Sequence, residues 1–386
     1  MEKIKKSLNE MLLAYYIFSF VLLARIIPNY KDVSTVILTL NVIGIIFISI
    51  VINNKKTKFT VSELLLDIGI LGMFVIDSSF RNNEFTNQIY IYMIIFAIIP
   101  NHLFLQIKSN EKFLNYYSLF ALLTALLYII DPFQSYKYSG DYMGFGYNVM
   151  LITYIGIYIK AREKKNILYY TILIIIMLEM AFFANKGAIL SIIIFTAIYE
   201  VIIKKNTVKN IIIIVICGIF IMSSNFIIEK IYTLAIDNGI NSYSIKTLYE
   251  MKNKTSSGLS GREEIWQSAK EMIKENFILG SGAGYYRANN KENLYVHNIV
   301  YDIIIEYGIV VFLLMSVIII KGITKLIKEK GSNKVVGIVF LIMWFPKLMF
   351  SSYLQAEIGF WLFVIWTLVK NRRQLEEKDE NKELNN

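Results

Sequence analysis

Long apolar runs alternate with short polar segments along most of this chain. Twelve of these runs are close to the roughly 20 residues that an α-helix needs to cross about 30 Å of hydrocarbon. The runs lie at 11–27, 33–52, 61–77, 88–107, 113–130, 145–160, 167–184, 187–203, 211–228, 298–320, 335–350 and 357–370. The pattern predicts an all-α polytopic membrane protein with about twelve transmembrane helices.

The composition supports this prediction. The 386 residues are 55% hydrophobic and the mean hydropathy is +0.50, whereas a soluble domain is about 45–50% apolar. The single cysteine, Cys217, lies inside the ninth apolar run, so neither a disulfide framework nor a cysteine-based metal site is expected.

The distribution of lysine and arginine predicts the orientation. With the N-terminus inside, the inner segments hold most of the basic residues, and the short outer loops hold little beyond Lys31, Arg81, Lys137 and Lys186. This bias explains the net charge of +10 without a nucleic-acid partner. Both termini are therefore predicted to be cytoplasmic, and the polar stretch before the tenth helix to be extracytoplasmic.

The predicted organisation has four parts. A large extracytoplasmic loop with short amphipathic helices separates two groups of spans, and a charged cytoplasmic tail ends the chain. The parts are residues 1–228 with helices 1–9, residues 229–296 with the loop, residues 297–370 with helices 10–12, and residues 371–386 with the tail.

Arg262 lies at the start of a predicted helix in this loop. Ser260 and Glu263 fit a capping box, and an apolar face follows it, formed by Ile265, Trp266, Ala269, Met272 and Ile273. A cation in a first helical turn costs about 0.3–1 kcal/mol. A bound phosphate would remove this cost, because it accepts hydrogen bonds from the free N–H groups and the guanidinium. A surface arginine beside a cap explains the pattern equally well.

The segment after this helix contains glycines and one of the two histidines. Residues 280–284 read Gly-Ser-Gly-Ala-Gly, but they lack the preceding strand of a dinucleotide fingerprint, and a close-packed turn is favoured. His297 opens the tenth run, where a neutral imidazole could take a proton from a hydroxyl. A capping or interface-anchoring histidine is the alternative. Asp302 and Glu306 share one helix face, and Glu306 with Gly308 suggests a buried acid beside a close helix contact.

In this order, and between a large external loop and a span, these elements resemble the O-antigen ligase/polymerase family. The elements are Arg262 with Trp266, Gly280 with Gly282, His297 with Asn298, and Glu306 with Gly308. In that family a Ser-Arg-Gly-like step also lies at the outer end of an earlier helical hairpin. This chain has Lys186 there in place of the arginine, followed by Gly187.

The resemblance implies inverting, metal-independent glycosyl transfer outside the membrane, with no cofactor and with a glycan on undecaprenyl diphosphate as the donor. By the same resemblance Arg262 and His297 are catalytic, Arg262 and Lys186 bind the diphosphate, and His297 is the base that activates the acceptor hydroxyl.

Three further residues are candidate substrate contacts. Glu179 is an acid inside a span and lies on the same helix face as Lys186, so it could pair with Lys186 or Lys347, or contact sugar. Arg287 lies between the glycines and His297, and Glu306 matches the family motif.

The leading functional hypothesis is a polysaccharide polymerase in the bacterial cytoplasmic membrane, with its active site on the extracytoplasmic face. It would join lipid-linked repeat units into capsule, exopolysaccharide or O-antigen, and a chain-length regulator is a candidate partner. A ligase that moves finished glycan to another acceptor is the alternative within the class. A lipid-linked oligosaccharide flippase is the alternative from another class, although polar residues near the middle of the spans are scarce.

Overall fold

The computed structural model describes most of the predicted spans and the second half of the loop. The described residues are 7–27, 30–53, 60–129, 143–183, 186–204, 230, 232–234, 237, 262–290, 295–350 and 352–369. Among them every regular element is a helix and none is a strand, which confirms the all-α prediction. The ninth run at 211–228, the predicted cap Ser260 and the tail at 371–386 lie outside the described residues.

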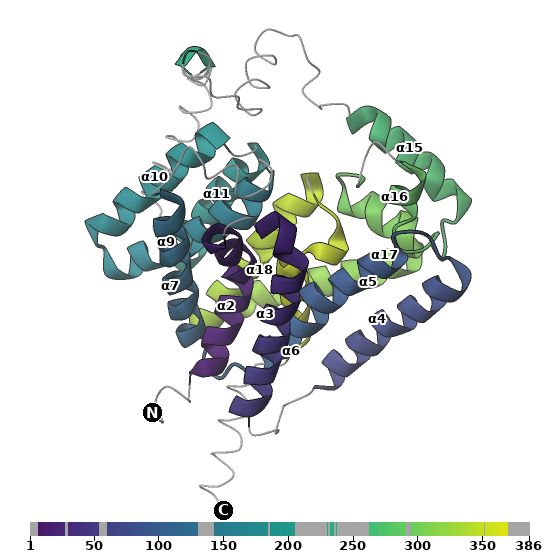
Figure 1. The fold of residues 1–386 in the computed structure, drawn as a ribbon, viewed down its shortest axis with the longest axis horizontal. Coiled ribbons are helices and arrows are strands. Elements are labelled where there is room, and N and C mark those ends of the chain that lie inside the picture. The colour runs from purple at the N-terminus through teal and green to yellow at the C-terminus, as the bar shows by residue number, and fades with distance from the viewer. Residues whose placement is uncertain are drawn as a thin grey trace, which may run out of the picture.

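Every predicted run other than the ninth coincides with one helix or with consecutive helical segments (Figure 1). Up to the middle of the chain these are α2 (Leu8–Ile26), α3 (Tyr30–Ile52), α4 (Val61–Phe80), α5 (Thr86–Met93), the π-helical η1 (Ile94–Ile98), α6 (Ile99–Gln106), α7 (Asn110–Ile129), the π-helical η2 (Gly144–Leu151), α9 (Ile152–Lys164), α10 (Ile167–Phe183), α11 (Lys186–Ile198) and the π-helical η3 (Tyr199–Ile203). After the loop come α15 (Arg262–Glu275), α16 (Tyr285–Asn289), α17 (Ile299–Lys328), α18 (Gly331–Phe350), the 3-10 turn η4 (Leu354–Ala356) and α19 (Ile358–Leu368).

Five helices in the described part are long and apolar enough to cross a membrane. They are Leu8–Ile26, Thr86–Gln106, Asn110–Ile129, Ile299–Lys328 and Gly331–Met349. Shorter apolar helices at Val36–Ile52, Ile167–Met180, Gly187–Ile203 and Ile358–Leu368 accompany them. The membrane assignment is therefore supported, and the count of about twelve spans stays a prediction.

Large apolar side chains stay exposed on the outside of the bundle. Val36, Leu65 and Val317 on α3, α4 and α17 are each more than 60% exposed. Water disfavours continuous apolar surface of this kind, whereas lipid tails solvate it well. The exposed side chains therefore mark surfaces that would face the bilayer.

Polar contacts gather at two opposite ends of the bundle. At the first end, where α2 begins, Glu10 accepts hydrogen bonds from the backbone N–H groups of Lys108 and Ser109, both at 2.9 Å. These two residues lie just before α7. Asn333 at the start of α18 accepts hydrogen bonds there from Asn110 and Trp366. At the second, the α15 end, α15 and α16 cover the end of α4 and the start of α17 (Figure 1).

Candidate active site

Helix α17 is interrupted at Gly308, whose φ of 79° and ψ of 174° are not helical. The break leaves backbone groups of α17 without partners inside the helix, and buried backbone groups need partners. The chain between α15 and α16 supplies them. The hydrogen bonds are Ser281 N to Ile305 O (2.7 Å), Gly282 N to Glu306 O (2.9 Å) and Ile309 N to Phe277 O (2.9 Å).

Glycine is required where this loop enters the broken helix. Gly280 has a φ of +73°, and a Cβ there would lie 2.5 Å from the carbonyl of Glu306. A Cβ on Gly308 would collide with the carbonyl of Ile278. Only glycine combines a positive φ with so close an approach of two backbones. The glycine run is thus the close-packed turn that the sequence predicts.

Helices α4 and α5 hold the same loop from its other side. Arg81 donates hydrogen bonds to the carbonyls of Leu279 (2.8 Å) and Gly280 (3.1 Å). The fully buried Asp77 forms an ion pair with Arg81 at 2.5 Å and accepts a hydrogen bond from the N–H of Ala283 at 2.9 Å. Sequence analysis did not predict a role for Asp77. The one sequence feature that could have indicated a role is the position of this acid at the end of an apolar run.

Glu306 bridges the glycine loop and the segment before α19. It is 4% exposed, and its Oε1 accepts the N–H of Gly284 at 2.9 Å. Its Oε2 accepts the side-chain amide of Gln355 at 2.5 Å. One turn earlier, Asp302 accepts the N–H of Leu354 at 3.3 Å. Both acids of the predicted α17 face are therefore buried, and each holds a residue of η4.

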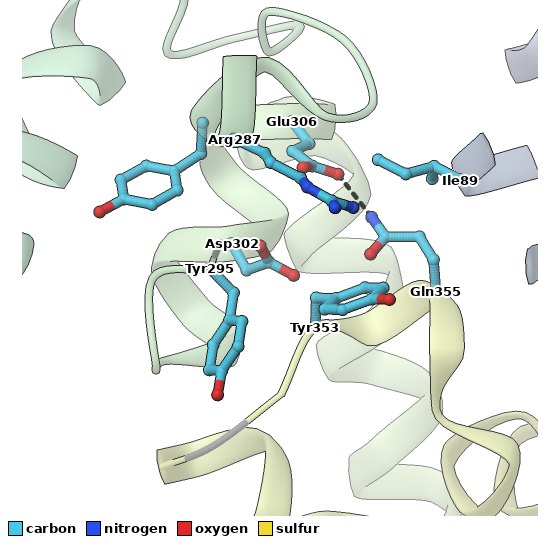
Figure 2. Close-up of a pocket in the computed structure, with 8 residues that line it drawn as sticks. Ile89, Arg287, Tyr295, Asp302, Glu306, Tyr353 and Gln355 are labelled. Carbon is cyan, nitrogen blue, oxygen red and sulfur yellow. Dashed lines mark hydrogen bonds between the residues drawn. The ribbon is translucent and has the colours of Figure 1, made fainter. Parts of the chain in front are cut away.

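A pocket opens beside these two acids (Figure 2). It is lined by Ile89, Tyr286, Arg287, Tyr295, Asp302, Glu306, Tyr353 and Gln355. The guanidinium of Arg287 lies 4.2 Å from the ring centre of Phe85 and donates to Gln88 at 3.2 Å. Burial raises the pKa of Tyr353 above its ordinary value, so its hydroxyl stays protonated at neutral pH.

The start of α15 packs against the segment that leads into α17. Ile265 and Ala269 on α15 form one buried cluster with Tyr286, Val296 and Ile305. Trp266, one turn after Arg262, donates from its indole N–H to the carbonyl of Val296 at 3.2 Å. The helix predicted to start near Arg262 and its apolar face are thus confirmed in α15, and they hold the chain beside His297.

His297 lies immediately before the N-cap of α17. Asn298 is that cap, since its side chain accepts the N–H of Val300 at 2.9 Å. His297 itself has a φ of 58°, a left-handed conformation that costs a non-glycine residue about 1–3 kcal/mol. Its ring lies 4.3 Å from that of Tyr295, centre to centre. The contact with Tyr295, which lines the pocket, therefore places the imidazole beside it.

The remaining predicted residues lie on α10 and α11. Lys186 begins α11, and its side chain lies outside the described residues. Glu179 on α10 is 4% exposed, and neither of its oxygens has a hydrogen-bond partner in the described part of the chain. Lys347, a predicted partner of Glu179, instead pairs with Glu357 and donates to Asn148 at 2.7 Å. That one pairing prediction is wrong, because α18 presents Lys347 to its neighbour α19.

Within the described residues, no three His, Cys, Asp or Glu side chains lie close enough together to hold a metal ion. The polar side chains at the α15 end instead carry guanidinium, imidazole, carboxyl, amide and phenol groups.

Residues 142–316 match the family model described as O-antigen ligase. This region belongs to the O-antigen ligase/polymerase family. No curated protein and no solved structure matches the chain. The family resemblance carried by the motifs is therefore confirmed. Members of the family are glycosyltransferase-like enzymes of bacterial membranes that act on lipid-linked glycans, and the match supports a function of that general type for this chain.

The family match covers only part of the site. It contains the predicted residues Glu179, Lys186, Arg262, Arg287, His297 and Glu306. The clamp residues Asp77 and Arg81 lie before it, and the pocket residues Tyr353 and Gln355 lie after it. The candidate site is thus assembled from the family region and from helices on both sides of it.

Proposed function

We propose that this protein is a polysaccharide polymerase. It joins oligosaccharide repeat units carried on undecaprenyl diphosphate at the extracytoplasmic face of the membrane, by inverting transfer without a metal. The observation that carries the proposal is the family match over residues 142–316, because that region contains every residue with a predicted role in the transfer.

The proposed step needs few groups. An acceptor hydroxyl oxygen attacks the anomeric carbon of the donor sugar, the new glycosidic bond forms, and the bond to the diphosphate breaks. His297 takes the proton of the hydroxyl as general base. The diphosphate leaves with the bonding electron pair, and Arg262 and Lys186 stabilise its charge. Both products are then complete without an oxidant, a reductant or a further co-reactant.

One contact and one general property of helix N-termini support this assignment of roles. The hydrogen bond from Trp266 to Val296 ties the first turns of α15 to the residue before His297. The N-terminal turns of α15 and α17 also leave backbone N–H groups without intrahelical partners, and such groups favour anions. A cation and a base on neighbouring helix starts suit a reaction in which a diphosphate departs as a hydroxyl attacks.

Genetic deletion tests the polymerase assignment. A strain without this protein should accumulate single repeat units on the lipid carrier, and its polymer should disappear from gels of envelope polysaccharide. Long chains still accumulating on the carrier would instead identify a ligase.

Reconstitution separates the polymerase from a flippase. Purified protein in liposomes should elongate lipid-linked repeat units without other enzymes, and His297→Ala and Arg262→Ala should each abolish elongation while the protein stays in the membrane. Movement of the lipid-linked glycan across the bilayer with no new glycosidic bond would contradict the proposal. Full-length polymer from His297→Ala would remove this residue as the base.

A further inference from the structure

We propose that residues 277–279, the segment directly after α15, insert into the lipid bilayer at the boundary of its hydrocarbon core. The partner is the acyl-chain region of the leaflet at the α15 end, and the insertion anchors α15 and α16 to the membrane. This contact with lipid goes beyond the proposed glycosyl transfer and does not depend on it.

Three large apolar side chains are exposed next to one another in this segment. Phe277, Ile278 and Leu279 are between 48% and 70% exposed. The exposed residues of α15 just before them are charged, and they are Lys270, Glu271, Lys274 and Glu275. An apolar patch bordered by charged residues is typical of a surface that contacts a membrane or another protein.

Helix α4 connects this segment to the lipid-facing surface. Arg81, the residue after α4, donates a hydrogen bond to the carbonyl of Leu279 at 2.8 Å. Just before Arg81, Phe80 is 85% exposed, and Ile76 one turn earlier is also exposed. In Figure 1, α4 runs along the edge of the bundle and ends beside the chain between α15 and α16. The exposed apolar side chains of α4 thus continue up to the segment.

The length of α4 sets the depth of the segment in the bilayer. The helix has 20 residues, so at roughly 1.5 Å per residue it is about 30 Å long, the thickness of the hydrocarbon core. Lys55, Lys56 and Lys58 precede it and Arg81 follows it, and basic side chains near the ends of a span reach out to the interface. Leu279, which Arg81 binds, therefore lies at the boundary of the core. A tilt of α4 would bring Leu279 deeper rather than shallower.

Helix α17 gives the same depth independently. From Ile299 to Ile309 every residue is buried or half-buried, and Val310 is the first exposed one. Exposed apolar side chains then continue to Ile327, a stretch of about 26 Å at roughly 1.5 Å per residue, which again matches the core. The N–H of Ile309 donates to the carbonyl of Phe277 at 2.9 Å. The segment therefore meets α17 where the lipid-facing part of that helix begins.

The polar backbone of the segment has donors from the protein. Irregular backbone is excluded from contact with lipid unless its polar groups are satisfied internally. The carbonyl of Phe277 accepts the N–H of Ile309, and the carbonyl of Leu279 accepts the guanidinium of Arg81. The break at Gly308 and the guanidinium thus bind the backbone from inside, while the apolar side chains stay exposed. A segment in contact with lipid requires this arrangement.

Spin labelling of the full-length protein in lipid nanodiscs tests the insertion. Cys217→Ser removes the single cysteine, and Ile278→Cys or Leu279→Cys then carries a nitroxide. Power saturation measures collisions of the nitroxide with oxygen, which concentrates in lipid, and with a nickel chelate, which stays in water. The ratio of oxygen to nickel collisions should be several-fold higher at both positions than at Gln267→Cys, an exposed polar position on α15. It should approach the ratio at Val317→Cys on the lipid-facing part of α17.

Three results would overturn the insertion. A ratio at either position equal to that at Gln267→Cys would place the segment in water. Collisions with neither reagent would place it against protein, such as a second copy of this chain. Failure of both labelled variants to fold would show that these side chains are packed, since a change at a lipid-facing side chain should leave the midpoint of thermal unfolding at that of Cys217→Ser. If only one variant fails to fold, the other decides.

The outcome is separate from that of the proposed function. No glycosyl transfer is measured in this experiment, so a failed elongation assay would reject the polymerase and leave the insertion standing.

Discussion

Two glutamates in this protein are equally buried and differently supported. Glu306 on α17 and Glu179 on α10 are each 4% exposed. Glu306 accepts a backbone N–H and a side-chain amide, whereas neither oxygen of Glu179 has a hydrogen-bond partner among the described residues. Both lie in apolar helices, so the sequence around each residue does not distinguish one from the other.

The difference shows what the glycine loop does. The break at Gly308 admits residues 277–284, and these bring the N–H of Gly284 to Glu306. Around α10 no comparable insertion reaches Glu179 in the described part of the chain. A buried carboxyl group with donors stabilises the fold, while one without donors is costly to the folded state. Glu306 is therefore a structural bridge beside the pocket, whereas no hydrogen bond among the described residues offsets the burial of Glu179.

The largest expected effect comes from closing the break with a side chain. Gly308→Ala adds a Cβ at a positive φ and against the carbonyl of Ile278, so it should lower stability by about 3 kcal/mol or more. The midpoint of thermal unfolding in detergent measures this. The control is Gly44→Ala on α3, where nothing lies within 4 Å of the added Cβ, and its midpoint should be unchanged or higher. Equal midpoints for the two variants would contradict the close packing of the glycine loop against the break in α17.

The second effect tests Glu306 directly. In Glu306→Gln one carboxylate oxygen becomes a donor that faces the amide nitrogen of Gln355. We expect a loss of about 2 kcal/mol, because a buried hydrogen bond disappears and two donors meet. Thermal unfolding of the purified variant gives the value. A variant as stable as the wild type would mean that Glu306 does not bridge the loop to η4.

A smaller effect is expected at the clamp on the other side of the loop. Arg81→Lys keeps the charge beside Asp77, but an ammonium has a single nitrogen, whereas the guanidinium binds the carbonyls of Leu279 and Gly280 through Nη1 and Asp77 through Nη2. The loss should be about 1 kcal/mol. Arg81→Ala, which also leaves the buried Asp77 unpaired, should be clearly less stable in the same assay. The reverse order would show that charge alone matters here.

The smallest effect sharpens the comparison itself. Glu179→Gln removes no hydrogen bond within the described part, so stability should change by less than about 0.5 kcal/mol or rise. A loss as large as that of Glu306→Gln would reveal a partner and end the contrast. Glycosyl transfer measured on the same sample separates the roles: lost transfer at full stability would support the predicted substrate contact of Glu179.

Much of the fold could be predicted because a membrane-spanning helix can be recognised from the length of its own apolar run. Apolar length alone located the runs that became α2, α7 and α18. The amphipathic spacing after Arg262 located α15 and its buried face. The motifs from Arg262 to Gly308 pointed to the family that residues 142–316 match.

The clamp and half of the pocket could not be predicted in this way. Arg81 lies 198 positions before Leu279, whose carbonyl it binds, and Gln355 follows Glu306 by 49 positions. No local pattern marks Gln355, since an isolated glutamine near the end of a span looks like any interfacial residue. The break in α17 was also not predicted, because Gly308 lies inside the apolar run at 298–320 and a glycine in a span is compatible with a continuous helix.

The sequence by itself determined where apolar helices form, where the polar loop begins to fold again at α15, and which family the motifs resemble. Helical hydrogen bonds close within four residues, and apolar length is read along one run. Only the tertiary structure decided that Glu306 has donors while Glu179 has none among the described residues, and that Tyr353, Gln355 and Tyr295 line one pocket. Those contacts depend on how distant helices pack, and a broken helix can be completed only by a chain segment that packing brings to it.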